Sequence, residues 1–154
     1  MAATIDAPPQ PEQFRRYAIN VRHSGQCLDV AGASQSNGAH LIQWPCHYNQ
    51  NQQWTPVAAG SGYYRLVVRH SGKCLDVEGA SQGNGAHLIQ WPCHLGTNQQ
   101  WRFVYLGNGY YRLVVRHSGK CLDVEGASQG NGAHLIQWPC HLGTNQQWRF
   151  TAVA

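Results

Sequence analysis

A repeat of 47 residues is the feature of this 154-residue chain that most constrains its fold. Residues 62–103 recur without a single change as residues 109–150, and a looser copy precedes both at about residues 16–57. The repeated stretch reads GYYRLVVRHSGKCLDVEGASQGNGAHLIQWPCHLGTNQQWRF. A fixed period of this length indicates equivalent structural units. We therefore expect three copies of one fold element and three copies of one function.

The pattern inside each unit is typical of short strands. Four runs rich in β-branched, aliphatic and aromatic residues are separated by clusters of Gly, Asn and Ser, as in chains of hairpins. No window has a 3.6-residue apolar period long enough for a helix. Twelve short strands in three quartets favour a closed all-β barrel with pseudo-threefold symmetry. A solenoid is the weaker alternative, because solenoids normally have atypical terminal repeats.

Composition and length narrow the function classes. Only 12% of the residues are charged, and the net charge of +4 comes from arginines spread singly along the strands. A nucleic-acid-binding surface normally concentrates its Lys and Arg on one face, so we expect no nucleic-acid partner. No apolar run approaches the ~20 residues of a membrane span, so we expect no membrane insertion. The length suits a single domain.

The first 14 residues contain three prolines and no apolar rhythm, which predicts an Ala/Pro-rich leader or linker stub. The remaining residues, 15–154, are predicted to form one domain with repeats at about 15–60, 61–107 and 108–154. The leader lacks the basic start and apolar core of a signal peptide. The chain is then either a cytosolic protein or a module of a longer secreted enzyme, and we favour the second.

The order of motifs in each unit resembles a known family. Cys-Leu-Asp-Val, a Gly-rich turn, Trp-Pro-Cys and Asn-Gln-Gln-Trp follow one another, as in ricin B-chain-type (R-type) lectins and family 13-like carbohydrate-binding modules. The Gln-x-Trp motif of that family ends at Trp54, Trp101 and Trp148, and the resemblance covers roughly residues 15–153. It implies a β-trefoil that binds carbohydrate and is not an enzyme. It also implies that these three tryptophans pack in the core.

Six cysteines, two per repeat and 19 positions apart, permit fifteen pairings. The resemblance implies a disulfide within each repeat. The expected pairs are Cys27 with Cys46, Cys74 with Cys93, and Cys121 with Cys140. Each closed loop would stabilise the fold by about 3 kcal/mol in the entropic model. Disulfides indicate an oxidising compartment, hence a secreted protein; the alternative is three pairs of buried free thiols.

Each unit holds the residue types that bind a sugar. An aromatic ring can cover the C–H face of a pyranose, a carboxylate accepts strong hydrogen bonds from hydroxyls, and amides both donate and accept. Transferred position by position, the resemblance implies five sugar-binding residues in each repeat. They are Asp29, Trp44, His47, Asn51 and Gln52; Asp76, Trp91, His94, Asn98 and Gln99; and Asp123, Trp138, His141, Asn145 and Gln146.

One position departs from the family pattern. Many members have Gln two residues before the stacking aromatic, where this chain has Ile42, Ile89 and Ile136. Two residues further upstream stand histidines that reach the sugar in other branches of the family. We include them as additional candidate ligands: His40, His87 and His134.

Metal and catalytic sites are not indicated. The nine histidines show no His-x(3–5)-His spacing, and the cysteines form no Cys-x-x-Cys pair, so we expect no metal and no cofactor. Only one carboxylate recurs in all three units, because Ala31 stands where the other repeats have Glu78 and Glu125. A paired-carboxylate glycosidase site is therefore unsupported.

The sequence thus predicts a monomeric, multivalent glycan-binding domain with up to three sites. Its ligands would be galactosides, or plant polysaccharides such as xylan and arabinan, and the module would be attached to a glycoside hydrolase in its natural setting. Two alternatives remain open. One is a β-trefoil used for protein–protein contact, since a fold does not fix a function. The other is an engineered or recently duplicated scaffold.

Overall fold

Twelve strands and six short 3₁₀ turns make up the regular structure of residues 10–154, the part of the chain that the computed structural model describes. The strands are β1 Tyr17–Val21, β2 Cys27–Val30, β3 Leu41–Trp44, β4 Trp54–Gly60, β5 Tyr63–Val68, β6 Cys74–Val77, β7 Leu88–Trp91, β8 Trp101–Gly107, β9 Tyr110–Val115, β10 Cys121–Val124, β11 Leu135–Trp138 and β12 Trp148–Ala152. The 3₁₀ turns are η1 Ala31–Ala33, η2 Gln50–Gln52, η3 Glu78–Ala80, η4 Thr97–Gln99, η5 Glu125–Ala127 and η6 Thr144–Gln146.

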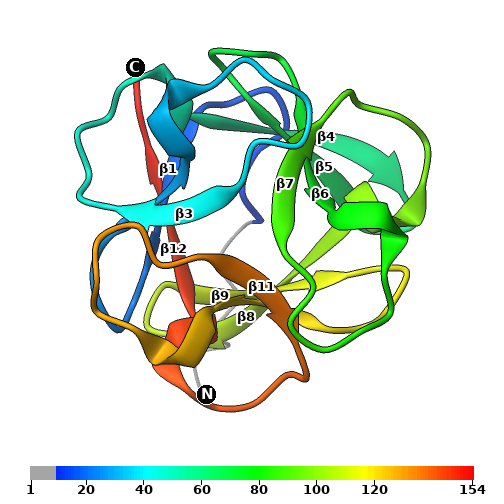
Figure 1. Ribbon diagram of the computed structural model, residues 1–154. Coiled ribbons are helices and arrows are strands. Elements are labelled where there is room, and N and C mark those ends of the chain that lie inside the picture. Colours follow the sequence, from blue (N-terminus) through cyan, green and yellow to red (C-terminus); the bar gives the residue numbers. More distant parts are fainter. Residues whose placement is uncertain (1–9) are drawn as a thin grey trace, which may run out of the picture.

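Six of the strands close into a barrel. β1 pairs with β12 and β4, β5 pairs with β4 and β8, and β9 pairs with β8 and β12, all antiparallel. The other six form the hairpins β2–β3, β6–β7 and β10–β11. Figure 1 shows three lobes, one for each repeat, with β3, β7 and β11 arranged around a central axis. The predicted all-β β-trefoil with pseudo-threefold symmetry is confirmed.

The core is built from the inward-facing residues of the barrel and hairpins. Leu, Ile and Val side chains from all three repeats lie in one buried cluster. Trp54, Trp101 and Trp148 are 0% exposed, and their indole Nε1–H groups donate to the carbonyls of Leu28, Leu75 and Leu122 at 3.1 Å. A buried indole needs such a partner. The predicted core position of the Gln-x-Trp tryptophans is therefore confirmed.

Each hairpin is fastened to the loop that follows it by a disulfide. The bonds join Cys27 to Cys46, Cys74 to Cys93 and Cys121 to Cys140, as the resemblance implied. The first cysteine of each pair begins β2, β6 or β10, and the second stands two residues after the tryptophan that ends β3, β7 or β11. The bridge therefore fixes the segment between the exposed tryptophan and the Gln-x-Trp motif.

A buried glutamine in each hairpin joins neighbouring repeats, a role that the sequence analysis did not predict. The Gln90 side-chain amide donates to the carbonyls of Ser34 and Ser36 in the first repeat, both at 2.8 Å. Its Oε1 accepts from the Ser71 hydroxyl at 2.8 Å. Gln43 and Gln137 make the corresponding bonds to the third and second repeats. These cyclic contacts hold the three lobes in register.

Part of the expected leader lies outside the described residues, which begin at residue 10. The described portion touches the barrel, where the Phe14 N–H donates to the Pro56 carbonyl at 2.9 Å. Within residues 10–154, the structure has no helix of the length and apolarity that crossing a membrane requires.

Candidate functional site

Each repeat forms one pocket at the base of its hairpin. The second pocket is bounded by the end of β6, the turn η3, the end of β7 and the segment before η4, with a volume of about 480 Å³. Its lining residues are Asp76, Glu78, Gly79, Ala80, Ile89, Trp91, His94 and Asn98. The third pocket is lined by the equivalent eight residues and has a volume of about 510 Å³. The first contains Asp29, Trp44, His47 and Asn51 and has a volume of about 360 Å³.

The turn after the aspartate gives the pocket its shape. Gly79 has a φ of 64° and Ala80 a φ of 51°, so two successive residues adopt left-handed backbone conformations. Glycine takes this conformation without the steric cost of a Cβ atom. The turn carries the chain sharply away from β6 and leaves Asp76 at the inner wall of the pocket. The sequence analysis treated this stretch only as a Gly-rich turn.

The aspartate is nearly buried and is held by the glutamine of the Gln-x-Trp motif. Asp76 is 2% exposed, and its Oδ2 accepts a hydrogen bond from Gln99 Nε2 at 2.8 Å. Gln99 is 0% exposed; its amide also donates to the Pro92 carbonyl and accepts from the His94 N–H. Gln52 and Gln146 hold Asp29 and Asp123 in the same way. The glutamines are thus placed to position the aspartates and lie out of contact with the pocket surface.

Burial changes the acidity of these aspartates. It raises the pKa of the Asp76 carboxyl above its ordinary value of 3.8, because desolvation disfavours the charged form. The hydrogen bond from Gln99 and the nearby His94 oppose this effect. The same causes raise the pKa of Asp29 and of Asp123. In its ionised form the carboxylate has about four lone-pair sites, so it can accept hydrogen bonds beyond the one from Gln99.

The histidine beside each aspartate is oriented by the backbone. The Gly96 N–H donates to His94 Nδ1 at 2.8 Å, which assigns the proton of the neutral ring to Nε2. Nε2 lies 3.7 Å from Asp76 Oδ2, and the corresponding distances are 3.6 Å in the first and third repeats. This is too long for a direct hydrogen bond. One donor and one acceptor therefore face the same small space.

The two tryptophans of each repeat have different environments. Trp91 is 41% exposed at the end of β7, whereas Trp101 is wholly buried. Trp44 and Trp138 match Trp91 in exposure and in their place on the pocket wall. Asn98 is largely buried at the opposite wall, where its amide donates to the Val77 carbonyl at 3.1 Å. Four of the five expected sugar-binding residues of each repeat thus line one pocket.

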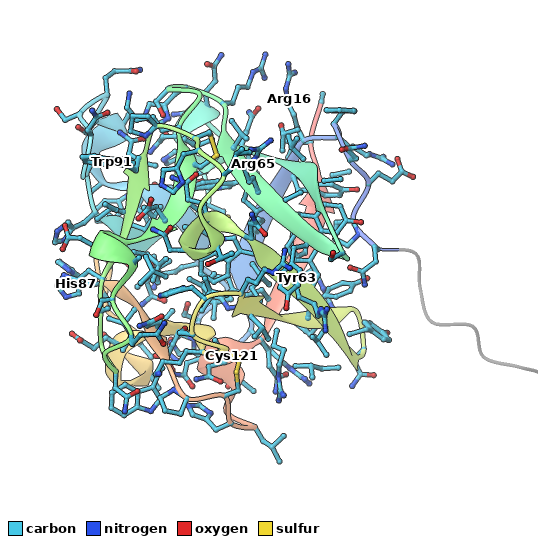
Figure 2. All side chains as sticks on the ribbon, turned by 90° about the vertical axis from the view of Figure 1, so that its right-hand side faces the viewer. Arg16, Tyr63, Arg65, His87, Trp91 and Cys121 are labelled. Carbon is cyan, nitrogen blue, oxygen red and sulfur yellow. A yellow bond between two sulfur atoms is a disulfide. The ribbon has the colours of Figure 1, made fainter. Side chains whose placement is uncertain are left out.

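The additional candidates His40, His87 and His134 lie elsewhere. They come together at the threefold axis, with ring centroids 4.9–5.0 Å apart, and do not line the three pockets described above. Burial and the two neighbouring histidines lower the pKa of His40 below its ordinary value of 6.5. Figure 2 shows His87 and Trp91 along the same hairpin face of the molecule.

Comparison with known proteins agrees with the fold. The family model of the ricin-type β-trefoil lectin domain matches residues 15–148. The designed threefold-symmetric protein ThreeFoil is 55% identical over 90% of this chain and 99% of its own, with a TM-score of 0.88. An exo-β-1,3-galactanase from Clostridium thermocellum, 1,3Gal43A, is 40% identical over 90% of this chain but only 30% of the enzyme, also with a TM-score of 0.88.

A lectin from Macrolepiota procera, solved in complex with lactose, has the same fold. Its TM-score is 0.81 at 23% identity, over 93% of this chain and 99% of the lectin. Fold and family together define a non-catalytic, carbohydrate-binding type of β-trefoil. The chain belongs to the ricin-type β-trefoil lectin domain family.

Proposed function

We propose that the protein is a trivalent lectin whose three pockets each bind one galactose-type residue of a glycan. The observation that carries this proposal is the same group of side chains in every pocket: a positioned aspartate, an exposed tryptophan, an oriented histidine and a largely buried asparagine. A catalytic role would not need this group three times.

The four side chains divide the work of sugar recognition. The Trp91 ring offers a flat apolar surface for the C–H face of a pyranose. Asp76 accepts hydrogen bonds from two neighbouring hydroxyls, and bonds to a charged acceptor are each worth about 1.5–3 kcal/mol. A hydroxyl placed between Asp76 and His94 donates to the carboxylate and accepts from Nε2–H. The 3.7 Å separation of these two groups leaves that bridge unmade in the protein alone.

The choice of galactose rests on the relatives and on the shape of the sugar. The galactanase relative acts on a β-1,3-galactan and is the 40%-identical match. In galactose, the axial 4-hydroxyl leaves one face as a continuous C–H surface suited to an exposed tryptophan. Xylan or arabinan is the alternative ligand, and the experiment below distinguishes these pentose polymers from galactan.

Three sites increase the strength of binding to a polymer. We expect one shallow pocket that opens to water to bind a sugar with a Kd of roughly 0.1–1 mM, which corresponds to a binding free energy of about 4–5.5 kcal/mol. Three pockets on separate lobes can engage several chain ends, and linked binding raises avidity by about 10²–10⁴. Three disulfides are consistent with an extracellular protein. In this proposal the domain is secreted, monomeric and attached to an enzyme that acts on the same polysaccharide.

The test measures retention of the purified chain on β-1,3-galactan, xylan and arabinan, with the triple variant Asp29→Asn, Asp76→Asn, Asp123→Asn as the matched control. We expect retention on galactan, elution by free galactose, and no retention of the variant. Retention on xylan but not on galactan would mean that the pockets bind a pentose instead of galactose. The protein would still be a lectin. If no glycan binds the folded chain, the scaffold or protein-contact alternative becomes the better account.

A further inference from the structure

Three histidines from three different repeats meet at the threefold axis. Each stands one residue before a hairpin strand: His40 before β3, His87 before β7 and His134 before β11. One ring nitrogen from each of the three lies within 4.8 Å of those from the other two, and His40 Nδ1 is 3.3 Å from His134 Nδ1. All three side chains keep some contact with solvent. This cluster is separate from the three sugar pockets.

The backbone holds the three rings in place. Isolated β-bridges link His40 to Ile89, His87 to Ile136 and His134 to Ile42, so each histidine is tied to the next repeat. The carbonyls of the three histidines also accept hydrogen bonds from the residues that open η1, η3 and η5, at 3.1 Å. The cluster is therefore fixed by main-chain contacts, which do not depend on the imidazole rings.

We propose that His40, His87 and His134 form a site for a single divalent transition-metal ion of the Zn²⁺ type. Three neutral imidazoles suit Zn²⁺, Cu²⁺ and Ni²⁺, whereas Ca²⁺ and Mg²⁺ require oxygen ligands. Two nitrogens bound about 2.05 Å from a tetrahedral zinc lie about 3.3 Å apart. The Nδ1 atoms of His40 and His134 already have this separation, and the third nitrogen lies within 4.8 Å of the other two ligand atoms.

The surroundings agree with a cation at this position. Glu78 lies close enough to His40 to act on it as a negative charge. Three protein ligands leave a fourth position open toward solvent for water or a small anion. The ion would join all three repeats at one point. Because binding to the folded state alone stabilises it, the metal should raise the melting temperature.

The first experiment titrates ZnCl₂ into the chelator-treated full chain by calorimetry. We expect one zinc ion per chain, no heat with CaCl₂ or MgCl₂, and a higher melting temperature in zinc. Replacing zinc by cobalt should give the visible absorption of a low-coordinate Co²⁺ site. A wild-type chain that binds no zinc, or binds calcium equally well, would overturn the proposal.

Two triple variants separate the axis from the pockets. The axis variant is His40→Asn, His87→Asn, His134→Asn, and the matched pocket variant is His47→Asn, His94→Asn, His141→Asn; each keeps six of the nine histidines. We expect the axis variant to lose the zinc equivalent and the pocket variant to keep it. Zinc binding that survives in the axis variant, or disappears in the pocket variant, would contradict the assignment. The single variant His87→Asn should weaken zinc binding at least about tenfold. It keeps the test possible if the triple variant does not fold.

Discussion

The pockets of the first and second repeats share their aspartate, tryptophan, histidine and asparagine but differ at the rim. Ala31 replaces Glu78, and Tyr48-Asn49-Gln50 replaces Leu95-Gly96-Thr97. The first pocket is smaller, at about 360 Å³ against 480 Å³. The second and third pockets come from identical sequences and differ by far less, at 480 and 510 Å³. The rim substitutions, more than the surroundings of each lobe, therefore account for the smaller first pocket.

The shared residues keep one geometry despite these differences. The His–Asp distance is 3.6 Å in the first pocket and 3.7 Å in the second, and the Gln–Asp hydrogen bond is 2.8 Å in both. The shared side chains thus keep their arrangement when the residues at the rim of the pocket change. We expect large effects from changes to the shared group and small effects from changes to the rim.

The largest effect should follow removal of the aspartate charge. Asp76→Asn keeps the shape and the Gln99 contact but replaces a charged acceptor, so affinity at the second site should fall at least tenfold, or about 1.4 kcal/mol or more. Asp29→Asn should do the same at the first site. Thermal melting should show an unchanged or higher stability, since a buried charge is removed. A variant that binds normally would show that Asp76 does not contact the sugar.

Loss of the exposed ring comes next. Trp91→Ala should weaken its own site by roughly 1–3 kcal/mol, with the stacking of bases on aromatic side chains as the guide to magnitude. Trp101→Ala is the matched control in the same repeat; it should unfold or strongly destabilise the domain, because it opens a large cavity. Calorimetry and thermal melting distinguish the two outcomes. A large loss of stability in Trp91→Ala with unchanged affinity would place that ring in a structural role.

The pH dependence should separate binding from stability. Burial raises the pKa of Asp76 and Asp123, so acidification should remove sugar binding at a higher pH than an ordinary aspartate would. The free energy of unfolding should change in the opposite direction. A carboxyl whose pKa is raised by folding stabilises the folded state when it is protonated, so this stabilisation is lost as the pH rises. Glu125 adds to the raised pKa of Asp123, while Ala31 stands in the first repeat.

All three sites should therefore lose binding at a higher pH than a site built on an ordinary aspartate. Calorimetric titrations from pH 7 to pH 3, with circular dichroism to follow folding, measure both effects. Glu125→Ala removes one of the causes that raise the pKa of Asp123, so it should lower the pH at which the third site loses binding. Affinity that is unchanged below pH 3.8 at every site would show that the ionised aspartates are not needed.

Exchanging the rims should have the smallest effect. Ala31→Glu with Tyr48→Leu in the first repeat, and the reverse pair in the second, should each shift affinity by about 0.2–1 kcal/mol, the range of exposed charged contacts. Titration with galactose and with a disaccharide gives the comparison. A reversal of sugar preference between the two sites would mean that the rim, and not the shared group, selects the ligand.

The repeats made much of this structure predictable from sequence. Strand and turn signals recur three times, so the trefoil, the Trp101 core position and the Cys74–Cys93 bridge all followed from one unit and its family resemblance. The positions of contacts between units did not follow. His40, His87 and His134 are 47 residues apart, and no local spacing rule for metal ligands detects residues brought together by a symmetry axis.

The roles of the buried glutamine side chains also could not be predicted from the sequence. Gln90 joins two repeats, whereas Gln99 in the same repeat positions an aspartate. The Gln90 amide donates to two backbone carbonyls, which every residue possesses and which the sequence therefore does not mark.

The most direct test of the central claim is the number of sugar sites. Calorimetry or native mass spectrometry with a galactoside should give three binding equivalents for the wild-type chain. Asp29→Asn, Asp76→Asn and Asp123→Asn should each leave two equivalents with their affinities unchanged. A folded single variant that loses all binding, or a wild-type chain that saturates at one equivalent, would contradict three independent sites.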